Sequence, residues 1–256
     1  MIIDYLLLFG AGLLGGVLNA VAGGGSFITF PALMWGGVAP ISANATNTLA
    51  SCAGYLSGAW AFRHDIKNHL SQLPLLIGVS LVGGAVGAWL LLQTPEAVFR
   101  GAIPWLLLLA TVLFIVGKPF SSALRQRAKP QRHAYTASAL LCLILLAASI
   151  YGGFFNAGLG IVILSCLALA GYSNINAMNG LKLVISSSIS ITAIVIFIYQ
   201  DAIVWPQGVA VLLGTLVGGY LAAHLSRQLP EALIRRTVIV ISSTITVYYF
   251  VTVYGR

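Results

Sequence analysis

Long apolar segments separated by short polar turns fill this chain from one end to the other. Each half of the sequence contains five of them, and four of the five are long enough to cross the ~30 Å hydrocarbon core of a bilayer as α-helices. The predicted segments are Ile2–Ala22, Phe27–Val38, Ser42–Phe62, Leu70–Leu92 and Glu96–Gly117 in the first half, and Tyr135–Asn156, Ile161–Gly171, Ile175–Gln200, Pro206–Arg227 and Glu231–Val253 in the second. The pattern predicts an all-α polytopic membrane protein.

The second segment of each half is too short to span a bilayer. Phe27–Val38 and Ile161–Gly171 cover at most about 18 Å as helices. Glycine-rich turns at Gly23–Gly25 and Gly158–Gly160 precede them. Backbone that leaves a helix at membrane depth must be buried in protein or line a watered cavity. Each half is therefore predicted to contain three to four membrane-crossing helices plus one short re-entrant or broken helix.

The two halves resemble each other. Val82–Gly84 is followed by Pro95–Ala97, and Val217–Gly219 is followed at the same spacing by Pro230–Ala232, with a constant offset of 135. Two further pairs match in the same order: Gly15–Asn19 with Gly152–Asn156, and Asn44–Asn47 with Asn176–Asn179. The predicted organisation is a first transmembrane repeat at 1–117, a basic cytoplasmic linker at 118–133 and a second repeat at 134–256.

Composition agrees with a membrane protein and excludes an ordinary soluble domain. Charged residues make up 7% of the chain and the mean hydropathy is +0.98, whereas soluble domains contain about 25% charged residues. The net charge of +8 does not indicate nucleic-acid binding, because five of the thirteen Lys and Arg lie in one linker without acids. Positive charge marks cytoplasmic loops, so the chain is predicted to be a multi-pass protein of the cytoplasmic (inner) membrane.

The same charges favour one topology. If the first two segments of each half form a re-entrant hairpin, the halves are inverted, with ten Lys and Arg in the cytoplasm and two outside. Parallel repeats with four crossings each place eight inside and four outside. The positive-inside rule favours the inverted repeats, with both termini outside. Inverted repeats with interrupted helices are a secondary-transporter pattern.

Lys182 is the only charged residue in the apolar stretch Ile175–Gln200. A lysine near the centre of a membrane helix costs roughly 2.5–3.5 kcal/mol, so such residues usually face a cavity or an opposite charge. All five acids lie at or near the ends of apolar segments, so the missing anion is predicted to be the substrate. The alternative is a lysine that snorkels to the interface.

The two broken helices predict an anion pocket. Gly24, Gly25 and Ser26 lead into one short helix, and Gly160 leads into the other. Helix N-termini present unpaired N–H groups and a positive dipole end, and they bind anions without a charged side chain. The alternative is that the glycines only allow close helix packing.

Asparagine side chains near these breaks could donate hydrogen bonds to substrate oxygens. Equally, each could cap a broken helix or join neighbouring helices. The candidates are Asn19, Asn44, Asn47, Asn156, Asn176 and Asn179.

Motifs for other functions are weak. Gly10-Ala11-Gly12-Leu13-Leu14-Gly15 fits G-x-G-x-x-G but lacks the acidic residue about 20 positions later. The histidines are not spaced as a metal site, and no hydrolase motif is present. The three cysteines are scattered within apolar segments. The sequence therefore predicts no enzyme activity, no cofactor and no metal site, and it carries no signal for an oligomeric state.

The glycine-rich turns resemble those of the sulfite exporter TauE/SafE family, also called the toluenesulfonate uptake permease family. The resembling residues are Gly15-Gly16, Gly23–Gly25 followed by Pro31–Leu33, the stretch Ala43–Leu49, and a weaker echo from Gly152 to Lys182. The resemblance implies transport of sulfur-containing anions such as sulfite and sulfonates across the cytoplasmic membrane. One departure is the second turn, where Leu159 interrupts the glycines.

The sequence thus predicts a secondary transporter that moves a small sulfur-containing oxyanion by alternating access. An anion channel and a non-transporting assembly or sensor subunit are the alternatives. Because no acid lies clearly within a span, coupling through a buried carboxylate is not expected. The transport modes that remain are uniport, exchange, and coupling to a cation held by backbone carbonyls.

Overall fold

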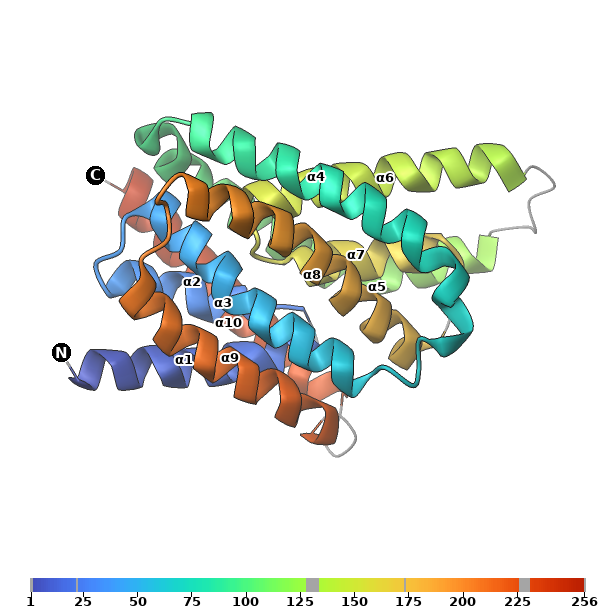
Figure 1. The fold of residues 1–256 in the computed structure, drawn as a ribbon, viewed down its shortest axis with the longest axis horizontal. Coiled ribbons are helices and arrows are strands. Elements are labelled where there is room, and N and C mark those ends of the chain that lie inside the picture. Colours follow the sequence, from blue (N-terminus) through green and yellow to red (C-terminus); the bar gives the residue numbers. More distant parts are fainter. Residues whose placement is uncertain (1, 22, 128–133, 173, 226–230, 256) are drawn as a thin grey trace.

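The computed structural model describes residues 2–21, 23–127, 134–172, 174–225 and 231–255, with the backbone alone at 68, 117–127, 134–140, 223–225 and 231–235. Within these ranges the chain forms ten α-helices, one short 3-10 helix and no strand (Figure 1). The first half contains α1 (Ile2–Val21), α2 (Ser26–Trp35), α3 (Pro40–Ala61), η1 (Lys67–Gln72), α4 (Leu73–Gln93) and α5 (Glu96–Arg127). The second contains α6 (Ala134–Phe154), α7 (Leu159–Leu169), α8 (Ile175–Tyr199), α9 (Trp205–Leu225) and α10 (Glu231–Tyr254). The all-α prediction is confirmed.

One predicted segment ends in the wrong place. Helix α5 continues ten residues past Gly117, through the first part of the predicted linker 118–133. Apolar character ends near Gly117, but the following Ala, Leu, Arg and Gln residues are good helix formers and extend the backbone hydrogen bonding. Residues 128–133 lie outside the described residues.

Six helices of the described part are long and apolar enough to cross a membrane: Ile2–Val21, His69–Gln93, Glu96–Val116, Ile175–Tyr199, Trp205–Ala222 and Arg236–Tyr254. Helices α2 and α7 have only 10 and 11 residues, so they end after about 15–17 Å. Both short helices were predicted. The chain is a polytopic membrane protein.

Helix packing follows the same scheme in both halves. Helix α1 packs along α9 as α6 packs along α4, and α3 contacts α9 as α8 contacts α4. Helices α3 and α8 contact each other, as do α5 and α10. In Figure 1, α1, α3, α5, α7 and α9 run from left to right, and the even-numbered helices run back. Each helix of the first half therefore points opposite to the helix five positions later.

Glycines permit the closest of these contacts. A Cβ added to Gly16 on α1 would lie 2.8 Å from the Cα of Thr215 on α9. Likewise, a Cβ added to Gly153 on α6 would lie 3.0 Å from the Cα of Gly84 on α4. Small residues let helix backbones approach in membranes, where the hydrophobic effect does not drive helices together.

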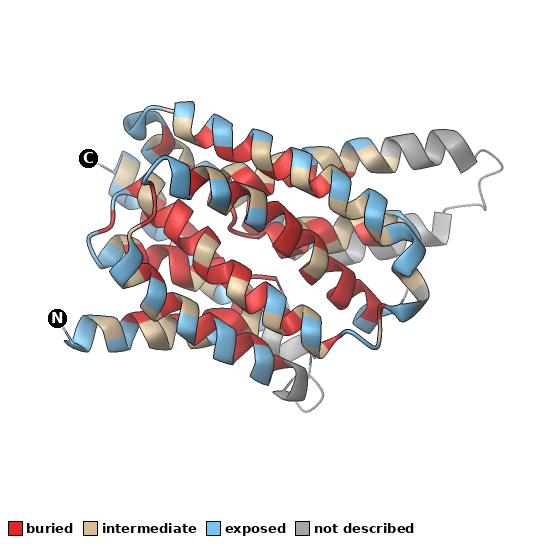
Figure 2. Cartoon of the chain, viewed as in Figure 1, coloured by how far each residue is buried: buried red, intermediate tan, exposed pale blue. Residues whose placement is uncertain are grey.

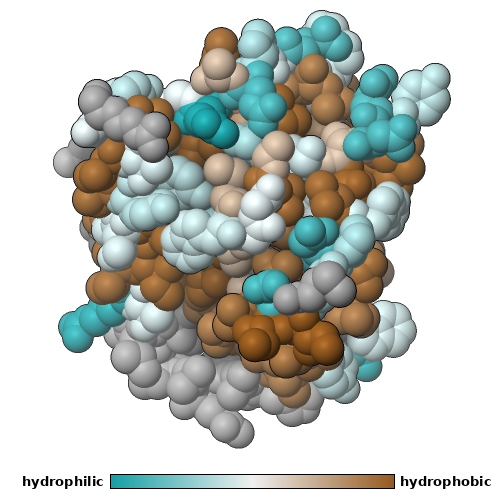
Figure 3. Space-filling view, turned by 90° about the vertical axis from the view of Figure 1, so that its left-hand side faces the viewer, coloured by the Kyte–Doolittle hydropathy of each residue, from teal (hydrophilic) through white to brown (hydrophobic). Residues whose placement is uncertain are grey.

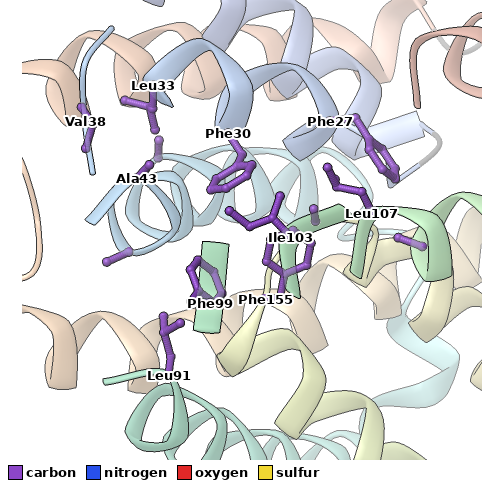
Figure 4. Close-up of a cluster of buried hydrophobic side chains, with 14 of the residues drawn as sticks. Phe27, Phe30, Leu33, Val38, Ala43, Leu91, Phe99, Ile103, Leu107 and Phe155 are labelled. Atoms are coloured by element: carbon purple, nitrogen blue, oxygen red, sulfur yellow. The ribbon is translucent and has the colours of Figure 1, made fainter. Parts of the chain in front are cut away.

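Buried residues fill the interior (Figure 2), and they include both an apolar cluster and a set of polar side chains. In the cluster, the rings of Phe30 on α2 and Phe155 after α6 meet edge to face at 5.6 Å, beside Phe99 of α5 (Figure 4). Helix α8 is the most buried candidate span: 61% of its window is buried, against 22–39% for the others. Lys182 therefore lies on the most central long helix.

Four of the five tryptophans are exposed near helix ends, and the fifth, Trp105, is exposed midway along the span Glu96–Val116. Trp35, Trp89 and Trp205 are exposed near helix ends at the left of Figure 1, the end seen face-on in Figure 3. Trp60 is exposed near the other end, where the Arg63 guanidinium lies 4.7 Å from its ring centroid. Tryptophan is enriched at both membrane–water interfaces, so the two ends fit the two faces of a bilayer.

Candidate functional site

The break between α1 and α2 is held by the side chain of Asn19. The backbone N–H of Gly25 donates to Asn19 Oδ1 at 2.7 Å, and Gly23 adopts a φ of +80°. A Cβ added to Gly25 would overlap the backbone carbonyl of Gly15 and lie 2.6 Å from Asn19 Cγ. Only glycine therefore fits at Gly25, and the turn keeps the amide of Asn19 buried against α2.

The break between α6 and α7 touches the first one. Gly158 adopts a φ of +78° just before α7 begins. A Cβ added to Gly160 would lie 2.6 Å from the Cα of Gly23, a distance that real Cβ atoms do not show. The turn before α2 thus meets the start of α7 in the interior, and the prediction of one pocket at the two broken helices is consistent with this contact.

Asn156 joins four elements around this contact. Its Oδ1 accepts hydrogen bonds from Tyr55 on α3 at 2.7 Å and from Ser26 on α2 at 3.3 Å. Its Nδ2 donates to Ser190 on α8 at 3.3 Å. All of these side chains are buried, so Asn156 links both halves through a single amide.

A chain of hydroxyl groups continues the network through the first half. The hydroxyls of Ser26 and Ser51 lie 3.4 Å apart, and Ser51 donates to Asn47 Oδ1 at 3.5 Å. Thr29 also donates to Asn47 Oδ1. Ser26, Thr29, Asn47 and Ser51 are fully buried. The network is therefore closed to solvent on both sides in this conformation.

Lys182 lies beside the same break with no exposed surface. Its Nζ donates to the backbone carbonyl oxygens of Asn19 at 3.1 Å and Ala20 at 3.0 Å, and to Asn179 Oδ1 at 3.1 Å. The first two are among the last carbonyls of α1, and that of Asn19 also accepts from the backbone N–H of Gly23 at 3.1 Å. The ammonium thus caps the end of α1, and its three acceptors are all neutral. It does not snorkel to the interface in this structure.

Two amide donors of the network have no partner among the described residues. They are Asn19 Nδ2 and Asn47 Nδ2, in side chains with at most 1% exposure. A buried donor without a partner costs about 1–3 kcal/mol, so such groups usually serve a ligand or a water. Asn19 is the clearer case, because the Gly25 N–H fixes which side-chain atom is the oxygen.

The other predicted asparagines are placed differently. Asn44 is buried and its Nδ2 donates to the carbonyl of Phe154 at the end of α6 at 3.0 Å. Asn179 is buried against Lys182, whereas Asn176 is exposed in the first turn of α8. Helices α3 and α8 begin at Pro40 and Ile175, an offset of 135. With this offset, Asn44 of the first half corresponds to Asn179 of the second, and Asn176 lies outside the buried network.

Three network residues were not singled out from the sequence: Thr29, Tyr55 and Ser190. Thr29 and Ser190 carry hydroxyls of the kind that also bond a helix's own backbone, and Tyr55 is one of several polar residues on α3. Only the crossing of α2, α3 and α8 brings them together.

A cavity of about 680 Å³ lies elsewhere, between α4, α6, α7 and α8. Its walls are mainly apolar, and His69, Gln72 and Tyr172 line one side. None of the predicted site residues is among its lining residues. The described residues also contain no group of three or more His, Cys, Asp or Glu side chains that could hold a metal ion.

Comparison with known proteins agrees with this architecture. The chain is similar to a "probable membrane transporter protein" of Haemophilus influenzae, 30% identical over 95% of this chain and 94% of the relative. It is also similar to the "probable membrane transporter protein YfcA" of Escherichia coli K12, 28% identical over 94% of this chain and 87% of the relative. No solved structure matches the chain. The sulfite exporter TauE/SafE family matches residues 8–249, and the chain belongs to this family of multi-pass membrane proteins.

Proposed function

We propose that the protein is a secondary transporter that moves a small sulfur-containing oxyanion across the cytoplasmic membrane by alternating access. The two halves, 1–117 and 134–256, act as inverted repeats around a shared site. The observation that carries the proposal concerns Asn19. Its backbone carbonyl accepts from Lys182, its Oδ1 accepts from the N–H of Gly25, and its Nδ2 has no partner among the described residues.

Inverted repeats are supported by the arrangement of the helices. Equivalent helices run in opposite directions in Figure 1, and their packing partners correspond. Arg63 and Lys67 lie between α3 and α4 at one end of the molecule, and Glu96 and Asp201 lie at the other. The positive-inside rule then puts the Arg63 end in the cytoplasm.

An anion site is supported by the donors that converge on the two breaks. Gly23, in the turn that leads into α2, contacts Gly160 at the start of α7, so the positive dipole ends of both short helices favour negative charge in this region. Asn19 and Asn47 offer spare amide donors, and the Lys182 ammonium supplies a full positive charge. A small oxyanion matches this set, because its several oxygens accept hydrogen bonds from different directions.

A carrier fits the burial better than a channel does. Ser26, Asn47, Ser51 and Lys182 have no exposed surface, so the centre is sealed from both faces. A conducting pore needs a continuous watered path, whereas a carrier passes through closed states. A non-transporting subunit would not need spare buried donors. The relatives are named as transporters rather than enzymes.

Sulfur is inferred from the family description, which names a sulfite exporter. The test has two parts on purified protein. A thermal-shift screen of sulfite, sulfate, methanesulfonate, phosphate and chloride should show stabilisation by a sulfur oxyanion, since a ligand of the folded state raises its stability.

Counterflow in proteoliposomes then separates the mechanisms. A carrier loaded with unlabelled anion accumulates the labelled anion transiently, whereas a channel only equilibrates it and a structural subunit moves neither. Equal stabilisation by all anions, together with no counterflow, would refute the proposal.

A further inference from the structure

The buried charge of Lys182 has no anionic hydrogen-bond partner among the described residues. Its three hydrogen-bond acceptors are two carbonyls and an amide oxygen. The acids whose side chains the structure describes lie at or beyond the ends of helices, and none of them is a hydrogen-bond partner of Lys182 Nζ: Asp4, Asp65, Glu96 and Asp201. A buried ammonium without a counter-charge is costly, and the cost is removed either by a bound anion or by loss of the proton.

A carrier must change conformation both loaded and empty. When an anion occupies the site, Lys182 and the anion neutralise each other. When the anion leaves, the same core holds one uncompensated charge through the return step. We propose, resting on the proposed function, that Lys182 releases its proton with the anion, so that each monovalent anion crosses together with one proton.

The cycle balances as follows. The amine of Lys182 takes a proton from water on one face, and the anion binds beside the resulting ammonium. After the conformational change the anion leaves on the other face, and Lys182 gives its proton to water there. The neutral amine returns. One anion and one proton have moved in the same direction, and no net charge has crossed.

The hydrogen bonds around Lys182 suit both protonation states. The ammonium donates to Asn19, Ala20 and Asn179. A neutral amine has two donors and one lone pair, and a rotated side-chain amide of Asn179 can donate to that lone pair. The two carbonyls at the end of α1 then keep their partners. Asn179 is therefore the residue that changes from acceptor to donor when Lys182 loses its proton.

Other titratable groups near α8 do not replace Lys182 in this role. None of them is a hydrogen-bond partner of its Nζ in the described part of the chain. On α8, on the helices that pack against it and on the adjoining segments 62–72 and 170–174, they are Asp4, Tyr5, Cys52, Tyr55, Arg63, His64, Asp65, Lys67, His69, Cys142, Tyr151, Cys166, Tyr172 and Tyr199.

The test uses the purified full chain in proteoliposomes with labelled methanesulfonate, a strong-acid anion that carries no proton itself between pH 5 and 9. With the outside one pH unit more acidic, uptake should reach about tenfold accumulation. For one anion coupled to one proton, the anion concentration ratio at equilibrium equals the proton concentration ratio. A trapped pH dye should report acidification of the lumen during uptake. A potassium–valinomycin potential should not drive accumulation.

Variants assign the proton to Lys182. K182Q should lose accumulation driven by the pH gradient but still show counterflow at equal pH, at a higher substrate concentration. K67Q, the same change at an exposed lysine between α3 and α4, should behave as the parent.

The outcomes separate the two proposals. Counterflow by the parent without a response to the pH gradient overturns proton coupling and leaves the transporter intact. A gradient response that survives in K182Q overturns the assignment to Lys182. Absence of counterflow by the parent overturns transport of this anion, and the coupling with it.

Discussion

The side-chain hydroxyls of Thr111 on α5 and Thr246 on α10 lie 3.2 Å apart, although the two residues are 135 positions apart in the chain. The same offset relates Gly84 to Gly219. In the proposed repeat, each threonine therefore contacts its counterpart in the other half. Contacts between equivalent residues occur at a two-fold axis, so such an axis would pass between α5 and α10.

The first prediction concerns the sides of the membrane. His64 and Asp201 are exposed after the ends of α3 and α8, helices that run in opposite directions. In a cysteine-free background, an impermeant maleimide should label D201C in intact cells and H64C only after permeabilisation, because Arg63 and Lys67 mark the cytoplasmic end. Labelling of both from one side would rule out inverted halves.

The second prediction concerns the contact between the two turns. G160A should lower thermal stability by roughly 1–3 kcal/mol, because its Cβ would press on the Gly23 backbone and force the turns apart. G10A is the matched control, since a Cβ there meets nothing within 4 Å and alanine favours the helix. Thermal unfolding in detergent compares them. If G160A is as stable as G10A, the turns do not touch as described.

The third prediction concerns Asn156. N156D keeps the acceptor for Tyr55 and Ser26 but loses the donor to Ser190 and adds a negative charge. A like charge 4 Å away costs about 4 kcal/mol at an effective dielectric of 20, and even a third of this lowers affinity about tenfold. Titration with sulfite, followed by thermal shift, measures the change.

The matched control for N156D is N174D. Asn174 is an exposed residue that caps α8 by accepting from the backbone N–H groups of Asn176 and Ala177. Aspartate caps a helix as well as asparagine does, so N174D should bind sulfite like the parent. Equal affinities of N156D and N174D would exclude Asn156 from the anion site.

Sequence patterns were sufficient for the helices and the breaks but not for the pairing of the repeats. Runs of apolar residues and clustered glycines are local signals, so α2 and α7 could be predicted as short helices. Sequence similarity pairs Asn44 with Asn176. Alignment of the helix starts instead pairs Asn44 with Asn179 and Asn47 with Lys182. A shift of three residues is close to one helical turn, so the apolar pattern fits both pairings. Only tertiary packing separates them.

The hydroxyl network could not be predicted from local sequence patterns either. Tyr55 reaches Asn156 from 101 positions away, and nothing near Tyr55 in the sequence indicates this partner. Such long-range bonds depend on how α3 crosses the turn after α6. The lysine, by contrast, could be singled out from its position alone, because an isolated charge in an apolar run is costly wherever the helix packs.

The last prediction tests whether Lys182 is the counter-charge of the anion. K182Q removes the charge and leaves two donors for three acceptors, so the carbonyls of Asn19 and Ala20 can stay capped. A charge-assisted hydrogen bond is worth about 1.5–3 kcal/mol, so sulfite affinity at constant pH should fall about 10- to 150-fold. Loss of the burial cost offsets the lost bond, so stability should change little.

K182R distinguishes charge from fit. Arginine keeps the positive charge, but its planar guanidinium group is larger than an ammonium group. The space around Lys182 is also tight, because a Cβ added to Gly160 would lie 3.3 Å from the Lys182 Cδ. K182R should therefore restore little affinity and should lower stability. Titrations of both variants, with folding checked by size-exclusion profile, measure this. Unchanged affinity in well-folded K182Q would remove Lys182 from the anion site and leave it as a cap of α1.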